Sequence, residues 1–151
     1  MTNQPPNLVS DRELVTSRML NASREQVFRA FSTPDHLAHW WGPKGFTNTF
    51  HEFDFRPGGT WRFIMHGPDG TDFQNESTFL EVVPPERVVI KHINNPKFEL
   101  TISLKEENGK TRIGWRQVFN TAEERQRIAK YAVDANEQNL DRLEKELSTF
   151  I

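Results

Sequence analysis

The strongest constraint on the fold is the last part of the chain, because residues 121–151 contain neither glycine nor proline. A segment of this length without a helix breaker favours one long helix. Thr121 and Glu124 form a capping-box pattern that marks where the helix begins. About seven turns are predicted, with one stripe of residues at spacings of three or four: Ile128, Tyr131, Ala132, Ala135, Asn139, Leu143 and Leu147.

Residues 46–119 carry a different period, since apolar and polar side chains alternate there as they do in strands. The clearest run is "FELTISLK", residues 98–105. Among the turn signals between the runs, Asn108–Gly109 is the strongest, because this dipeptide favours a two-residue hairpin. The glycines of residues 56–59 and 67–70 are expected in hairpin turns that need positive φ. This pattern predicts a meandering antiparallel sheet with one buried face.

One strand and two short helices are predicted before the sheet. The strand is "DRELVTSRML", residues 11–20. Ser23 and Gln26 form a capping box for the first helix, and Thr33–Pro34 opens the second. The order is strand, two short helices, six strands and one long helix, which is an α+β fold. The long C-terminal helix is the only element large enough to cover the apolar face of the sheet.

Composition excludes several functional classes. A net charge of -2 and a pI near 6.2 argue against nucleic acid or a membrane surface as partners. Cysteine is absent, which excludes a disulfide framework and agrees with a reducing cytoplasm. No apolar run approaches the roughly 20 residues of a membrane helix, and the first residues do not resemble a signal peptide. We expect a cytoplasmic protein with a flexible tail at residues 1–9 and one domain at residues 10–151.

The predicted long helix carries small or polar residues where large ones would fill space. The sheet, in contrast, offers large rings from a chain with 12 Phe and 4 Trp. This combination is typical either of close packing or of a hollow that a ligand fills, and the pattern leaves both open. The candidate ligand-binding residues are Trp40, Trp41, Trp61, Phe63, Met65, Phe79, His92, Phe98, Leu100, Trp115, Gln117, Phe119, Ile128, Tyr131, Ala132, Ala135 and Asn136.

Some members of this set carry a more specific expectation. Adjacent residues on a helix point about 100° apart. One of Trp40 and Trp41 is therefore expected in the core and the other at the cavity mouth. The Tyr131 hydroxyl and the Gln117 amide are expected to be buried, and a buried polar group needs a partner, which the polar end of a ligand could supply.

Four stretches in order carry a family resemblance: "STPDHLAHWWGPKGF", "FDFRPGGTWRFIMHGPDG", "FLEVVPPERVVIKH" and "NLDRLEKEL". With them the chain resembles the START-like, helix-grip (SRPBCC) superfamily over roughly residues 12–147. Within it, the chain is similar to the branch of homologues of the activator of the heat-shock-ninety chaperone ATPase. The combination of Trp-Trp-Gly-Pro with Arg-Pro-Gly-Gly and an aromatic strand is specific for this branch.

The resemblance implies a curved antiparallel sheet of about seven strands wrapped on one long C-terminal helix. Two short helices close one end, and a cavity between helix and sheet takes apolar small molecules. This chain departs from the family pattern at Ser77 and at residues 136–138, where members often carry glycine or other small residues. Because these side chains are bulkier and more polar, the cavity could be smaller than in other members, and a partly polar ligand is favoured.

Enzymatic and metal-binding motifs are scarce. His36 and His39 have a spacing that could share a metal, but no further ligand motif accompanies them, so we predict no metal. No nucleophile elbow, Walker motif or dinucleotide glycine pattern is present, so we predict no cofactor. His92 is the one weak catalytic candidate: facing inward it could act as a general base, and otherwise it makes an ordinary satisfied hydrogen bond.

Three functions therefore compete. The preferred one is a binding module for a small apolar or aromatic molecule in the helix–sheet cavity. The second is a co-chaperone that stimulates a heat-shock ATPase, although such activators typically carry an additional N-terminal domain. The third is a small cyclase or hydrolase acting in the cavity, since superfamily cyclases use few and variable polar groups. An exposed tryptophan or sheet edge leaves a homodimer open.

Overall fold

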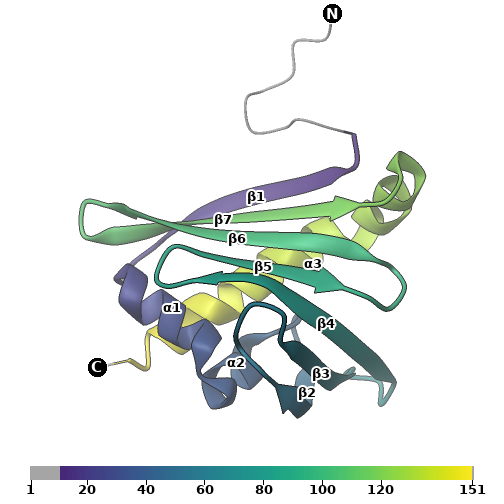
Figure 1. Ribbon diagram of the computed structural model, residues 1–151, viewed down its shortest axis with the longest axis horizontal. Helices are drawn as coiled ribbons and strands as arrows, with labels where there is room; N and C mark the ends of the chain where they lie inside the picture. The colour runs from purple at the N-terminus through teal and green to yellow at the C-terminus, as the bar shows by residue number, and fades with distance from the viewer. Residues whose placement is uncertain (1–10, 151) are drawn as a thin grey trace, which may run out of the picture.

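The computed structural model describes residues 11–150, so the predicted tail at residues 1–9 lies outside the described part. The strands form one curved 7-stranded antiparallel sheet in the order β1-β7-β6-β5-β4-β3-β2 (Figure 1). The elements are β1 (Glu13–Leu20), α1 (Arg24–Ser32), α2 (Pro34–Trp40), β2 (Thr47–Phe53), β3 (Thr60–His66), β4 (Asp72–Val83), β5 (Arg87–His92), β6 (Phe98–Glu107), β7 (Lys110–Phe119) and α3 (Ala122–Leu147).

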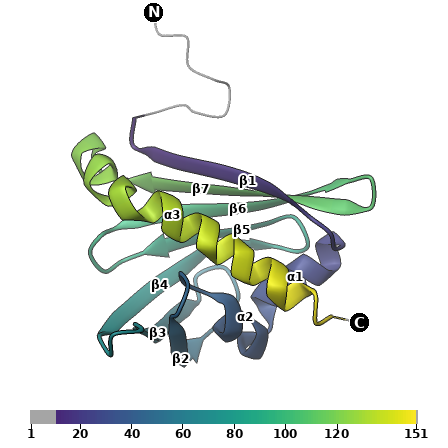
Figure 2. The same ribbon diagram turned by 180° about the vertical axis from the view of Figure 1, so that it is seen from behind.

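Helix α3 runs across one face of the sheet, and α1 and α2 lie together beside the C-terminal end of α3 (Figure 2). This arrangement confirms the predicted α+β helix-grip fold, with the long helix as the cover of the apolar face. No helix within residues 11–150 combines the length and the apolar character needed to cross a membrane.

The helix starts follow the sequence signals. The Ser23 hydroxyl accepts from the Gln26 backbone N–H at 3.2 Å, and the Gln26 side chain accepts from the Ser23 N–H at 3.1 Å. These two bonds satisfy donors that a helix otherwise leaves open at its first turn. Helix α3 begins in a related way, because the Thr121 hydroxyl accepts from the Glu124 N–H at 3.1 Å. Pro34 starts α2, where its missing N–H is not needed.

Turn glycines follow two different rules. Asn108 and Gly109 have φ angles of 53° and 79°, as the two-residue turn of the β6–β7 hairpin requires. Gly58 also has a positive φ, of 83°. For Gly59 and Gly67 the expectation of positive φ was wrong. A Cβ on Gly59 would lie 1.9 Å from the carbonyl oxygen of Asp54, so this position needs glycine for close backbone approach.

An arginine on the first strand ties α3 to the edge of the sheet. Arg18 on β1 contacts three carboxylates of α3, those of Glu137 at 2.9 Å and of Asp141 and Glu144 at 2.7 Å. The acidic partners are largely exposed, so each pair contributes little free energy of unfolding. Together they fix the lateral position of α3 over the sheet.

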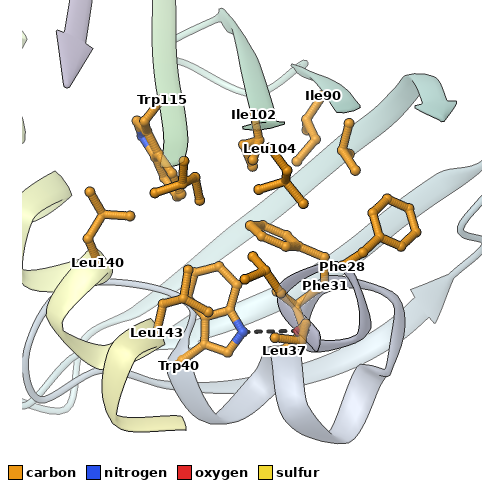
Figure 3. Close-up of a cluster of buried hydrophobic side chains, with 14 of the residues drawn as sticks. Phe28, Phe31, Leu37, Trp40, Ile90, Ile102, Leu104, Trp115, Leu140 and Leu143 are labelled. Atoms are coloured by element: carbon orange, nitrogen blue, oxygen red, sulfur yellow. Dashed lines mark hydrogen bonds between the residues drawn. The ribbon is translucent and has the colours of Figure 1, made fainter. Parts of the chain in front are cut away.

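Beneath the C-terminal half of α3 the interior is filled with side chains (Figure 3). Leu140 and Leu143 of α3 are fully buried. Trp40 packs edge-on against Phe31, with ring centroids 4.8 Å apart. Its indole N–H donates to the carbonyl of Ala30 at 3.0 Å, which satisfies the one polar atom of the ring. We call this region the solid end.

Candidate ligand-binding cavity

Beneath the N-terminal half of α3 lies a cavity of about 650 Å³. Its walls are the inward face of β3 to β7, the first half of α3, and the loop that follows α2. We call this region the hollow end. Its lining includes most of the predicted residues, namely Trp41, Trp61, Phe63, Met65, His92, Phe98, Leu100, Gln117, Ile128, Tyr131, Ala132, Ala135 and Asn136.

Four predicted residues do not line this cavity. Trp40 is enclosed by the short helices at the solid end. Phe79 stacks on Trp61 with the ring planes 7° apart. The rings of Phe53 and Phe55 also pack against it edge-on. Trp115 is buried in the same cluster. Phe119 packs with Leu14, Ile128 and Ala132 in a second buried cluster. Neighbouring side chains pack against Trp40, Phe79 and Trp115, whereas Phe119 borders a separate pocket at the end of β7.

Trp40 and Trp41 are divided between core and cavity. Trp40 is 1% exposed, whereas Trp41 is half-buried and lines the cavity. The Trp41 ring lies 5.0 Å from that of Trp61 and 5.7 Å from that of Trp115, measured between centroids. Trp41 thus forms the boundary between the solid end and the hollow end.

The two polar side chains expected inside behave differently. Gln117 is 8% exposed, and its Oε1 accepts a hydrogen bond from Asn136 Nδ2 at 3.2 Å. Tyr131 is 58% exposed, so the prediction of a buried hydroxyl was wrong. Each helical residue turns by about 100°, which places Tyr131 on the flank of the buried stripe. Its ring borders the cavity from the mouth.

His92 faces inward but is already engaged. Its Nδ1 donates to the carbonyl of Pro96 at 2.9 Å, and its Nε2 lies 2.8 Å from Asn75 Oδ1. The ring also stacks on Phe98 at a centroid distance of 4.7 Å. Burial lowers the pKa of His92 from its ordinary value of 6.5, although hydrogen bonds to the backbone oppose that shift. The bond to Pro96 and the stacking on Phe98 hold the ring in the wall, which fits the satisfied alternative of the sequence analysis better than a general base.

Polar side chains of α3 shape one wall of the cavity through the loop after α2, residues 41–46. Arg142 donates to five carbonyl oxygens at the end of α2 and along this loop, at 2.7 to 3.2 Å. Asn139 accepts from the Gly42 N–H at 3.1 Å. The loop places Trp41, Pro43 and Phe46 in the cavity wall. Helix α3 therefore positions the wall opposite the sheet as well as contributing its own residues.

Several lining residues were not predicted. Ile90 ends the apolar run of residues 88–90 in β5, where no alternation reveals the inward face. Asn75 and Ser77 lie on β4 on the same face as Phe79, but their polar side chains gave no apolar signal. Ser77 is 3% exposed and lines the cavity, so the departures at Ser77 and Asn136 leave a cavity in place. The others are Pro43, Phe46, Asp72, Phe73, Gln74, Asn95 and Pro96.

The histidine pair considered as a metal site lies outside the cavity. His36 Nδ1 is 2.7 Å and His39 Nδ1 is 3.4 Å from the same carboxylate oxygen of Glu146. Within residues 11–150 no group of three or more metal-ligating side chains is gathered. The two histidines join α2 to the end of α3.

Comparisons with known proteins agree with this architecture. A protein of Nitrosomonas europaea is 24% identical, with a TM-score of 0.84 over 91% of this chain and 95% of that chain. For a protein of Chromobacterium violaceum the identity is 26% and the TM-score 0.80, over 88% and 95%. An AHSA1 protein of Silicibacter pomeroyi is 20% identical, with a TM-score of 0.73 over 90% and 97%. A search of curated proteins found no match.

The family model described as activator of Hsp90 ATPase homolog 1-like protein matches residues 21–148, which is most of the chain. These residues include α1, α2, the strands β2 to β7 and α3, and so all the walls of the cavity. The chain therefore belongs to the AHSA1-like family of the helix-grip (SRPBCC) superfamily.

Proposed function

We propose that this protein is a cytoplasmic binding module that holds a small apolar or aromatic molecule in the cavity between the sheet and α3. The observation that carries the proposal is the cavity of about 650 Å³ under the first half of α3. Ligand sites commonly have about 300–1,000 Å³ and predominantly apolar walls with a few polar groups. Here the walls are mostly aromatic and aliphatic, with Ser77, His92 and Gln117 as the buried polar members.

The contrast with the solid end supports this reading. Around Leu140 and Leu143 the same sheet face and the same helix form a cluster of buried apolar side chains. Unfilled apolar volume lowers stability, because the lining atoms lose packing contacts. A hollow of this size, confined to one end, is therefore most simply explained by a ligand that fills it.

The test is a melting-temperature screen with lipids and uncharged aromatic compounds, together with native mass spectrometry of the purified protein. A ligand that binds the folded state alone raises the melting temperature with its concentration. Ala135→Phe should fill the cavity and abolish that rise. Val133→Phe, on the exposed side of α3, is the matched control and should leave the rise intact.

If no compound raises the melting temperature and nothing co-purifies, the proposal fails. An equal ligand response in Ala135→Phe and the parent protein would place the binding elsewhere. Stimulation of a heat-shock ATPase by this chain would favour the co-chaperone function instead. Substrate turnover that is lost in His92→Ala would favour the enzyme.

A further inference from the structure

Several polar groups that border the cavity have protein partners, whereas the indole N–H of Trp61 is buried and has none within the described part of the chain. His92 Nδ1 donates to the carbonyl of Pro96, and its Nε2 faces the Asn75 side chain at 2.8 Å. The Asn75 amide nitrogen in turn donates to the carbonyl of Phe73 at 3.0 Å. These groups form a closed network along β4 and β5, and they have little hydrogen-bonding capacity left for a ligand.

The Gln117–Asn136 pair on the other side of the cavity is different. Its single internal bond runs from Asn136 Nδ2 to Gln117 Oε1 at 3.2 Å. Among the described residues no further partner engages Gln117 Nε2 or Asn136 Oδ1, although Gln117 is only 8% exposed. If both amides are turned over, one donor and one acceptor again stay free. The pair therefore presents one donor and one acceptor side by side at the cavity wall, where they are open to a ligand.

The charges around the cavity restrict what that partner can be. Asp72 is the only carboxylate among the described lining residues, and neither lysine nor arginine is found among them. Asp72 lies at the rim, where its Oδ1 is 2.7 Å from His66 Nδ1. A carboxylate buried here would have no cation to pair with, and desolvation would strongly disfavour it.

We propose that the cavity selects an uncharged apolar or aromatic molecule that carries a hydroxyl group, and that this hydroxyl bonds to the Gln117–Asn136 pair. A hydroxyl donates one hydrogen bond and accepts others, so it matches a neighbouring acceptor and donor. An ether can use only the donor of the pair, a hydrocarbon uses neither, and a carboxylate brings an unpaired charge. This inference rests on the proposed function and adds the chemical class of the ligand.

The test uses probe families that differ only at the polar end. Naphthalene, biphenyl and phenanthrene are each measured as the hydrocarbon, the hydroxyl, the methoxy and the carboxylate derivative, at pH 7.5 by calorimetry or tryptophan fluorescence. For the skeleton that fits, we expect the hydroxyl form to bind about tenfold more tightly than the methoxy form, the effect of one to two hydrogen bonds. The carboxylate should bind most weakly.

Variants assign the preference to the pair. In Gln117→Leu, and in the double variant with Asn136→Leu, the hydroxyl preference should fall to about twofold or less, while binding of the hydrocarbon is kept. Ser77→Ala removes a buried hydroxyl elsewhere in the cavity wall and should keep the preference. Thermal melts confirm that each variant is folded.

The outcomes separate this inference from the proposed function. If hydrocarbon and hydroxyl forms bind equally, or the carboxylate binds best, the inference is wrong while ligand binding stands. If the preference disappears in Ser77→Ala but not in Gln117→Leu, the assignment to the pair is wrong. If no form of any skeleton binds, both the inference and the proposed function fail.

Discussion

The two ends of the space under α3 are built from the same materials but are packed differently. At the solid end Leu140 and Leu143 project from α3 into a cluster that includes Trp40 and Trp115 (Figure 3). At the hollow end the residues of α3 that line the cavity include the small Ala132 and Ala135, and neither α1 nor α2 contributes a side chain to the lining. The comparison shows that the cavity exists because α1 and α2 fill only one end of the space between α3 and the sheet. Small residues of α3 leave the other end open.

The largest effect that would sharpen this comparison is expected from truncating a leucine at each end. Leu143→Ala at the solid end should lower the free energy of unfolding by about 4 kcal/mol, because it opens a new void in a filled core. Leu100→Ala at the hollow end should cost about 2 kcal/mol, since its side chain already borders a cavity. Urea denaturation measures both, and equal costs would contradict the division of the interior.

A second effect concerns Arg142, which holds the loop after α2, and with it Trp41, between the two ends. Arg142→Met removes the hydrogen bonds to five carbonyls at and beyond the end of α2. We expect a loss of about 2–3 kcal/mol in the free energy of unfolding and weaker binding of any cavity ligand, because Trp41 loses its fixed place. Arg112→Met, whose partner Glu107 lies on the neighbouring strand β6, is the control and should change stability by less than about 1 kcal/mol. Unchanged ligand affinity in Arg142→Met would argue against the role of the loop.

Adding side-chain volume should lower the free energy of unfolding at the solid end and change it little at the hollow end. Ala30→Leu at the solid end has no space to occupy and should cost about 1–3 kcal/mol. Ala135→Leu at the hollow end should change the free energy of unfolding by less than about 1 kcal/mol, in either direction, since the added methyl groups enter the cavity. Equal destabilisation of both variants would contradict the division into a filled end and a hollow end.

The smallest expected effect is the pH dependence contributed by His92 at the hollow end. Its pKa is lowered in the folded state by burial, so between the lowered value and 6.5 the unfolded chain binds the proton more readily. The stability that comes from a neutral His92 is therefore complete above about pH 6.5 and is lost as the pH falls below that value. His92→Gln should show a smaller decrease in the free energy of unfolding between pH 7.5 and pH 5.5 than the parent protein. Identical pH profiles would contradict this.

Much of the fold could be predicted from local signals. The capping residues at Ser23 and Thr121, the proline at the start of α2 and the turn at Asn108–Gly109 each act over a few residues, and the structure confirms all of them. Such signals depend on hydrogen bonds and φ preferences within one turn of chain, which the sequence states directly. Gly59 was misread because its constraint is a contact with Asp54, which only the folded backbone brings close.

For the candidate site, the sequence could predict which residues lie on the inward face of the sheet but not which of them border the cavity. Alternation indicates that Trp61, Phe63 and Phe79 point inward, and all three do. It does not say that Phe79 meets other rings whereas Phe63 borders a cavity, because that depends on which elements lie opposite each position along the strand. The inward-facing Asn75 was missed because its side chain is polar, although the two-residue period puts it on the same face of β4 as Phe79.

The sequence by itself determined the order of the elements, their ends, and which residues share a face, because these depend on the period of the chain and on interactions within a few residues. Only the tertiary structure decided that α1 and α2 fill one end under α3 and leave the other open. It also joined Gln117 of β7 to Asn136 of α3. Both outcomes depend on where a helix crosses a curved sheet, which is set by packing between segments far apart in the chain.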